Sequence, residues 1–115
     1  MDSSIIDGKA IARLDTWGGS HLVSQMIRLF LKHSAERLRQ IRSALEDEPG
    51  ELPERGAHEL KSSAANLGAV RIVALASEVE EAARGRDFHR VQELLPELEA
   101  AVHQGCAELE PLLEG

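Results

Sequence analysis

The sequence predicts an all-α protein, an antiparallel up-and-down four-helix bundle with a short extra N-terminal helix. Apolar residues recur at the three-and-four spacing of an amphipathic helix along nearly the whole chain. The signals of strands, alternating apolar and polar runs and Asn-Gly or Asp-Gly hairpin turns, are missing. Aromatic residues make up only 3% of the chain and tyrosine is absent. The core must therefore be built from Leu, Ile, Val and Ala, which suits packed helices.

The first half of the chain predicts two helices. An Asp cap begins a short helix over about 7–16, and the glycine pair at 18–19 ends it. A Ser cap begins a long helix over about 20–47, and the Pro-Gly pair at 49–50 closes it. This long helix carries a continuous apolar stripe, which predicts one buried face.

The second half predicts three further helices. One covers about 52–67 and ends at Gly68, and the next covers about 69–84. Asp87 caps the last helix, in which Pro96 should cause a kink or a split. Because the loops are short, successive helices are expected to be antiparallel neighbours.

Length and charge limit the possible functions. The 115 residues suffice for one domain with one core, so residues 1–115 are expected to form a single domain. The formal charge of −7 argues against binding to nucleic acid, which requires a basic surface. The absence of a basic amphipathic helix argues against binding to a membrane surface.

The sequence also predicts a location. No apolar run has the length needed to span a bilayer, and the first residues lack the basic and apolar stretches of a signal peptide. Cys106 is the only cysteine, so an intrachain disulfide is impossible, and its expected role is that of a small helical residue. We therefore expect a cytoplasmic protein.

His58 is the strongest candidate for chemistry. On a helix that turns about 100° per residue, it lies opposite a stripe of apolar and small residues. The members of that predicted core stripe are Pro53, Gly56, Ala57, Leu60, Ser63, Ala64 and Leu67. His58 is therefore predicted to be a solvent-facing imidazole in the middle of a rigid helix.

The neighbours of His58 favour an incoming anion. Lys61 lies one turn later, where its ammonium group could reach a group attached to the imidazole. Ser62 and Ala65 share the exposed side and are small, which leaves room for another surface to approach. Phosphoryl transfer needs this combination of an in-line nucleophile and positive charge near the transferring oxygens.

This segment resembles the signature of the histidine phosphotransfer (HPt) family. The matching positions are His58, Leu60, Lys61, Ser63, Asn66, Leu67, Gly68 and Ala69. The one departure is Ser62, where the family most often has glycine, and serine is still small. The resemblance extends over nearly the whole chain.

The resemblance implies a role for each matching residue. His58 would be the phosphorylated residue, through Nε2, and Lys61 would help to position and neutralise the phosphoryl group. Gly68 would permit the tight turn into the next helix, and Leu60 and Leu67 would belong to the core.

The resemblance also implies the partners. The family relays phosphoryl groups between the aspartates of response-regulator receiver domains, or from a hybrid sensor kinase, in bacterial two-component phosphorelays. The receiver would supply Mg²⁺ and a lysine, so this chain needs no cofactor or metal of its own. Arg55 and Lys61 would meet the acidic pocket of the receiver, and Ser62 and Ala65 would face it. The chain has no Gly-rich phosphate loop and no acidic pair suited to Mg²⁺, so it is expected neither to bind ATP nor to phosphorylate itself. A carrier is therefore expected rather than an enzyme, and the carrier is expected to be a monomer.

Several other interpretations compete with this one. The remaining histidines are expected to be ordinary surface or packed residues, and no histidine or cysteine pair has the spacing of metal ligands. Glu78, Glu80 and Glu81 are expected to form the solvated side of their helix. The chain could also be a non-phosphorylated helical adaptor with an HPt-like fold, although such an adaptor should lack the histidine or the lysine. It could be a module excised from a hybrid sensor kinase, although the initial Met1 and the absence of a linker favour a free-standing protein.

Overall fold

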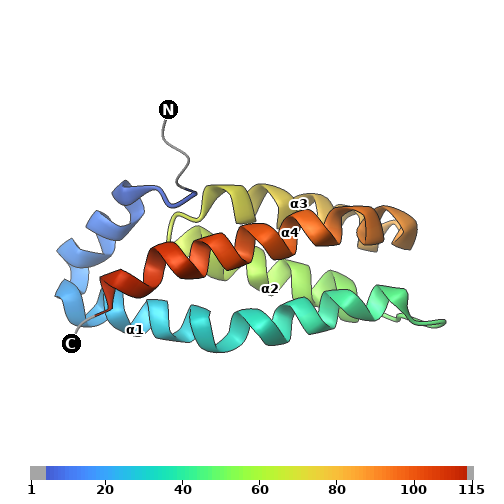
Figure 1. Ribbon diagram of the computed structural model, residues 1–115, viewed down its shortest axis with the longest axis horizontal. Coiled ribbons are helices and arrows are strands. Elements are labelled where there is room, and N and C mark those ends of the chain that lie inside the picture. Colours follow the sequence, from blue (N-terminus) through green and yellow to red (C-terminus); the bar gives the residue numbers. More distant parts are fainter. Residues whose placement is uncertain (1–4, 114–115) are drawn as a thin grey trace.

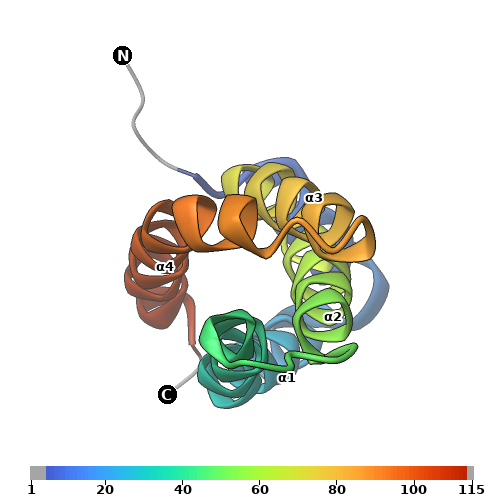
Figure 2. The same cartoon turned by 90° about the vertical axis from the view of Figure 1, so that its right-hand side faces the viewer.

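A computed structural model describes residues 5–113 and confirms the predicted fold class. Four long helices surround one core, and Figures 1 and 2 show each of them beside its neighbours in the chain, with α4 returning to α1. Within residues 5–113 the sole strand-like feature is an isolated bridge between Ile6 and Ala69. The elements in order are α1 (Gly8–Arg42), η1 (Ser43–Leu45), α2 (Leu52–Asn66), α3 (Val70–Arg84), α4 (Phe88–Leu109) and η2 (Glu110–Leu112).

The short N-terminal helix is the first part of α1. Its N-cap is Asp7, whose side chain accepts a hydrogen bond from the Lys9 amide. The helix is interrupted at Gly19, where φ is 71° and ψ is −172°, a conformation open to glycine but costly for other residues. After this kink the chain turns into the long helix, so that the first turns cross one end of the bundle (Figure 1). The predicted stop at the glycine pair is therefore confirmed.

The remaining helix ends agree closely with the prediction, with two differences. The long part of α1 ends at Arg42 and tightens into the 3₁₀ turn η1, rather than continuing to residue 47. Pro96 does not split α4, which is one helix of 22 residues with the proline on its exposed side. In Figure 2 the early orange turns of α4 run across the view and the later red turns are seen closer to end-on, so the helix bends along its length.

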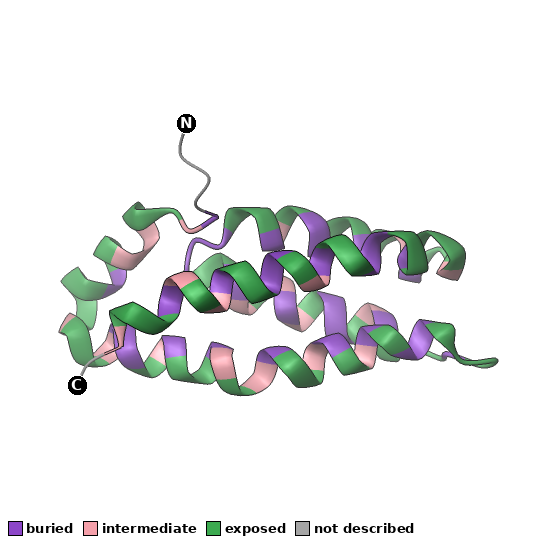
Figure 3. Ribbon diagram, viewed as in Figure 1, coloured by how far each residue is buried: buried purple, intermediate pink, exposed green. Residues whose placement is uncertain are grey.

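The core lies between the inward faces of the four helices, as Figure 3 shows by the buried positions along each ribbon. On α2 the predicted core stripe is buried, including Leu60 and Leu67 with 1% exposure each. Ser63 differs, because it is only half-buried and its hydroxyl donates to the Glu59 carbonyl at 3.0 Å. The phase of α2 about its axis is therefore the one predicted, with His58 on the outside.

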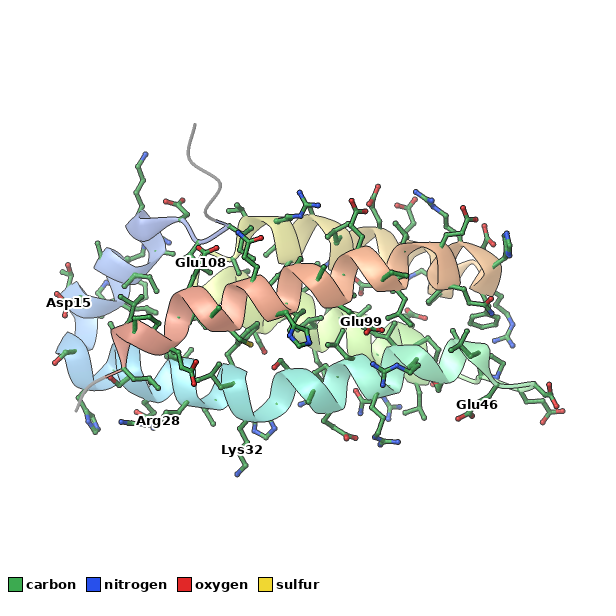
Figure 4. All side chains as sticks on the ribbon, in the orientation of Figure 1. Asp15, Arg28, Lys32, Glu46, Glu99 and Glu108 are labelled. Atoms are coloured by element: carbon green, nitrogen blue, oxygen red, sulfur yellow. The ribbon has the colours of Figure 1, made fainter. Side chains whose placement is uncertain are left out.

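The segment before α1 fastens the turn between α2 and α3. The Asp7 amide donates to the Gly68 carbonyl at 2.7 Å, and the Val70 amide donates to the Ile5 carbonyl at 3.0 Å. The Ile5 amide also donates to the Glu108 carboxylate of α4 at 3.2 Å, and Figure 4 shows Glu108 near the start of this segment. Three parts of the chain that are distant in sequence thus meet at one end of the bundle.

Hydrophobicity gives a separate finding. Of the helices in residues 5–113, none combines the length and the apolar character needed to cross a bilayer.

Candidate functional site

His58 lies at the middle of α2 on its outward face, and 59% of its side chain is exposed. The helix fixes its backbone, because residues on both sides of it belong to continuous α-helix. The exposure predicted from the helical phase is therefore what the structure has.

A buried glutamate on α3 connects His58 with Lys61. Glu80 Oε2 lies 2.7 Å from His58 Nδ1, and Glu80 Oε1 lies 2.6 Å from Lys61 Nζ. Only 6% of the Glu80 side chain is exposed. His58 and Lys61, the two residues predicted from the sequence to take part in the chemistry, thus contact the two oxygens of one carboxylate.

The charge state of Glu80 determines which ring nitrogen of His58 carries a proton. Burial acts to raise the pKa of Glu80, but hydrogen bonds and positive charge from Lys61 and His58 outweigh it and hold this pKa below its ordinary value. The carboxylate is therefore ionised at neutral pH and can only accept hydrogen bonds. Nδ1 of His58 must then be the donor, so Nε2 carries the lone pair of the neutral ring.

A second pair of charged residues extends this arrangement. Arg84 Nη2 lies 3.2 Å from Glu80 Oε2, and Arg84 Nε lies 3.2 Å from Glu54 Oε2. Glu54 belongs to α2 and precedes His58 by one turn. The side chains of α2 and α3 therefore alternate in charge from Glu54 through Arg84 and Glu80 to Lys61.

The placement predicted for Glu80 was wrong. It was expected on the solvated side of its helix with Glu78 and Glu81, which are indeed exposed. On a helical wheel Glu80 is only about 80° from the buried Ile72, whereas Glu78 and Glu81 are on the far side. A separate wheel for this helix could have distinguished the three glutamates.

A shallow depression opens beside His58. Its volume is about 420 Å³, and its lining residues are Glu51, Glu54, Arg55, His58, Glu80 and Arg84. Arg55, predicted to face the partner, thus lies next to the histidine and is exposed. Ser62 and Ala65 are also exposed, one and two turns after His58 on the same side of α2.

A second groove runs between α1 and α2. Its volume is about 310 Å³, and its lining residues are Met26, Leu29, Phe30, His33, Arg37, Ser63 and Asn66. Leu29 is 47% exposed, although it is large and apolar. The sequence carries no signal for this groove, because side chains of two packed helices form it together.

Gly68 occupies the turn between α2 and α3, as predicted. Its φ of 70° lies in the left-handed region. A Cβ atom there would be 2.7 Å from both the Ala10 Cβ and the Asp7 carbonyl oxygen. Glycine is therefore required both by the backbone conformation and by the close approach of the N-terminal segment.

Metal ligands do not gather at the site or elsewhere in the described part of the chain. No group of three or more His, Cys, Asp or Glu side chains there is arranged to hold a metal ion. The chemistry available at the site is that of an exposed imidazole with a fixed proton on Nδ1 and cations nearby.

Comparisons with known proteins show the family of this chain. A family model described as the Hpt domain matches residues 25–111. A solved structure, the histidine-containing phosphotransfer protein B (HptB) of Pseudomonas aeruginosa PAO1, is similar over 96% of this chain and 95% of that chain. The TM-score is 0.85 and the sequence identity is 24%, so the likeness is one of fold. A search of curated proteins gave no significant match.

Proposed function

We propose that His58 carries the phosphoryl group in this chain, which belongs to the Hpt domain family and serves as a histidine-containing phosphotransfer protein of a two-component phosphorelay. The single observation that carries this proposal is the hydrogen bond of 2.7 Å between His58 Nδ1 and Glu80. It leaves Nε2, the nucleophilic nitrogen of the neutral ring, on the exposed side chain of an outward-facing residue.

The transfer step follows from this tautomer. Nε2 attacks the phosphorus of an aspartyl phosphate in line, and the N–P bond forms as the bond between phosphorus and the aspartate oxygen breaks. The electron pair of the broken bond stays on the aspartate carboxylate. The ring keeps its proton on Nδ1 and becomes an imidazolium, so no external base is needed.

Glu80 would stabilise the ring cation that forms. Its carboxylate already accepts the Nδ1 proton, and the attraction between them increases when the ring becomes positive. The return of the phosphoryl group to a second aspartate reverses the same charges. This symmetry suits a carrier that must both accept and donate.

Lys61 would neutralise the transferred group. Its ammonium is held by Glu80, next to the ring. Phosphorylation brings about two negative charges to Nε2. A rotation of the lysine side chain would bring its ammonium to the phosphoryl oxygens, while the imidazolium, still bonded to Glu80 through Nδ1, keeps a positive charge beside that carboxylate.

The partner that fits this site is a receiver domain of a response regulator or of a hybrid sensor kinase. We expect it to lie on the face formed by Arg55, Ser62 and Ala65, and to supply Mg²⁺ and a lysine from its own acidic pocket. The small side chains of Ser62 and Ala65 allow close approach, and Arg55 offers positive charge to that pocket. We further expect a cytoplasmic monomer that binds neither membrane nor nucleic acid.

The protein is a phosphoryl carrier, and we propose that it neither binds ATP nor phosphorylates itself. Incubation of the pure protein with radiolabelled ATP and Mg²⁺ should leave the chain unlabelled. Incorporated label, or release of phosphate above the background of the buffer, would contradict this part of the proposal.

The acceptor assignment is tested by replacing His58. Incubated with a phosphorylated receiver and Mg²⁺, the parent should gain one acid-labile, base-stable phosphate and His58→Gln none. His89 provides the matched control, because it is an exposed histidine that lies 3.4 Å from a glutamate one turn away, so His89→Gln should be labelled like the parent. Label on His58→Gln would show that another residue accepts the phosphoryl group. A parent protein that binds receivers without gaining phosphate would favour the non-phosphorylated helical adaptor.

A further inference from the structure

Beyond Glu80, a second layer of side chains joins α2 and α3 beside His58. Arg84 contacts Glu80 through Nη2 and Glu54 through Nε, each at 3.2 Å. Glu54 and His58 stand one turn apart on α2, and Arg84 and Glu80 stand one turn apart on α3. The four side chains thus make a chain of contacts between the two helices, from Glu54 through Arg84 and Glu80 to His58.

Glu80 accepts three donors with its two oxygens. His58 Nδ1 and Arg84 Nη2 both approach Oε2, whereas Lys61 Nζ approaches Oε1. Donors on both oxygens restrict rotation of the carboxylate about its last bond. The position of Oε2, and with it the orientation of the imidazole, therefore depends on Arg84 as well as on Lys61.

Arg84 can hold Glu80 only if its own side chain is kept in one conformation. Its side chain is 63% exposed, and a long exposed arginine samples many rotamers unless a partner holds it. Glu54 supplies this partner from the opposite helix, at 3.2 Å from Nε. The guanidinium is then held at both ends, by one acid at Nε and by the other at Nη2.

We propose that Glu54 and Arg84 are positioning residues for phosphoryl transfer at His58, acting through Glu80. The inference rests on the proposed function of His58. Arg84 holds the Glu80 carboxylate in place through its contact with Oε2, so that this oxygen stays directed at the Nδ1 proton of His58. Glu54 holds Arg84 in the geometry that does this.

The arrangement differs from an ordinary surface ion pair. Arg71 and Glu97 form such a pair between α3 and α4, at 3.3 Å and with both side chains exposed. Exposed pairs of this kind contribute little to stability. Arg84 differs because its second contact is a buried carboxylate that contacts the candidate nucleophile. Replacing Arg84 should therefore lower the rate of phosphoryl transfer more than it lowers the free energy of unfolding.

The test uses four variants of the full chain. Arg84→Gln removes both contacts of the guanidinium, whereas Glu54→Gln removes only the charged partner at Nε. The double variant combines the two changes, and Arg84→Lys keeps the charge. Arg71→Gln is the matched control, because it breaks an exposed pair between helices away from His58. Each variant is labelled by a phosphorylated receiver with Mg²⁺ and, separately, by phosphoramidate, and the ¹⁵N shifts and two-bond ¹⁵N–¹H couplings of the His58 ring report where its proton resides.

Labelling by both donors should slow by about three- to thirtyfold in Arg84→Gln and Glu54→Gln, which is less than the roughly hundredfold loss that a misplacement of a reacting group by about 1 Å can cause. The double variant should be no slower than Arg84→Gln alone, since the two residues act in series. Arg84→Lys should recover part of the rate, and Arg71→Gln should match the parent. The ring signals of Arg84→Gln should show a smaller population with the proton on Nδ1.

Three results would overturn the inference. If Arg84→Gln and Glu54→Gln are labelled as fast as Arg71→Gln, the Glu54–Arg84 pair has only a structural role. Slower labelling by the receiver alone, with normal labelling by phosphoramidate, would make Arg84 a docking residue. Additive losses in the double variant would show that Glu54 does not act through Arg84. The His58→Gln experiment tests the acceptor itself, so the two failures are distinguishable.

Discussion

His58 Nδ1 and Glu80 Oε2 lie 2.7 Å apart across the hairpin of α2 and α3, and each residue stands eleven positions from Ala69 in the sequence. In an antiparallel hairpin with a short turn, residues at equal distances from the turn lie side by side. Glu54 and Arg84 obey the same relation, fifteen positions from Ala69. The turn therefore determines which side chains of α3 can serve the histidine.

Glu80→Gln should slow phosphoryl acceptance at His58. The amide can still accept a hydrogen bond from Nδ1, but it has no charge with which to stabilise the imidazolium that forms. We expect a loss of about ten- to a thousandfold, the range of one charge contact made to a transition state. Quench-flow labelling from a phosphorylated receiver measures it, and an unchanged rate would leave Glu80 with a structural role only.

The same variant should show a pH-dependent loss of stability. Because the pKa of Glu80 in the folded protein lies below its ordinary value of 4.5, ionised Glu80 stabilises the fold above that pH. This contribution is lost as the pH falls through the lower pKa of the folded state. Urea unfolding should therefore show a gap between parent and Glu80→Gln of about 1–3 kcal/mol at pH 7, which narrows below pH 4.5; a gap that widens in acid would contradict the direction.

Lys61→Ala should slow transfer by about ten- to a thousandfold, because it removes a cation beside the transferred group. Alanine favours helix, so the circular dichroism spectrum should not change. Lys61→Arg is the control, and it should retain much of the rate because its charge can reach the same oxygens. If Lys61→Ala transfers as fast as the parent, Lys61 is an ordinary surface lysine.

Larger side chains beside His58 should block phosphoryl transfer from a receiver domain but not from a small-molecule phosphoryl donor. Ser62→Leu and Ala65→Arg fill exposed positions on the predicted docking face, and substitutions at such positions seldom cost more than about 0.5 kcal/mol. Transfer from a receiver should be abolished, while phosphoramidate should still label His58. Ala100→Arg, at an exposed alanine on α4, should behave like the parent. Variants that unfold, or that also lose the small-donor reaction, would refute the docking role.

Gly68→Ala should destabilise the fold by about 2–4 kcal/mol. The added methyl group makes the left-handed backbone conformation unfavourable, and it also clashes with the N-terminal segment. Gly85→Ala is the matched control. It stands at a helix end with φ of −80° and with no atom nearer than 3.7 Å to the added methyl group, so it should be neutral or slightly stabilising. Equal midpoints of thermal unfolding for the two variants would contradict the account of Gly68.

Helical spacing predicted most of this structure from the sequence. The phase of α2 followed from one apolar stripe, which placed His58 outside and Leu60 inside. The glycines at 19 and 68 marked a kink and a turn, because only glycine adopts their backbone conformations without cost. These signals are local, so a single sequence is enough to read them.

The contacts of His58 were harder to predict, because they depend on a second helix. The charge of Glu80 predicts an exposed residue like its neighbours. Its helical phase, however, places it near the buried face, and its distance from the turn places it level with His58. Arg84 carries no local signal at all, since an arginine at a helix end is common. The groove beside Leu29 arises from the packing of α1 on α2 and has no counterpart in either helix alone.

The attachment of the N-terminal segment has a consequence for hydrogen exchange. Turns usually exchange their amide protons quickly, because they open without disturbing the rest of a protein. Here the amides of Asp7 and Val70 are bonded across the turn at Gly68, and Glu108 anchors the same segment to α4. Opening this turn would also release parts of α1 and α4, so its amides should exchange nearly as slowly as those of the core helices.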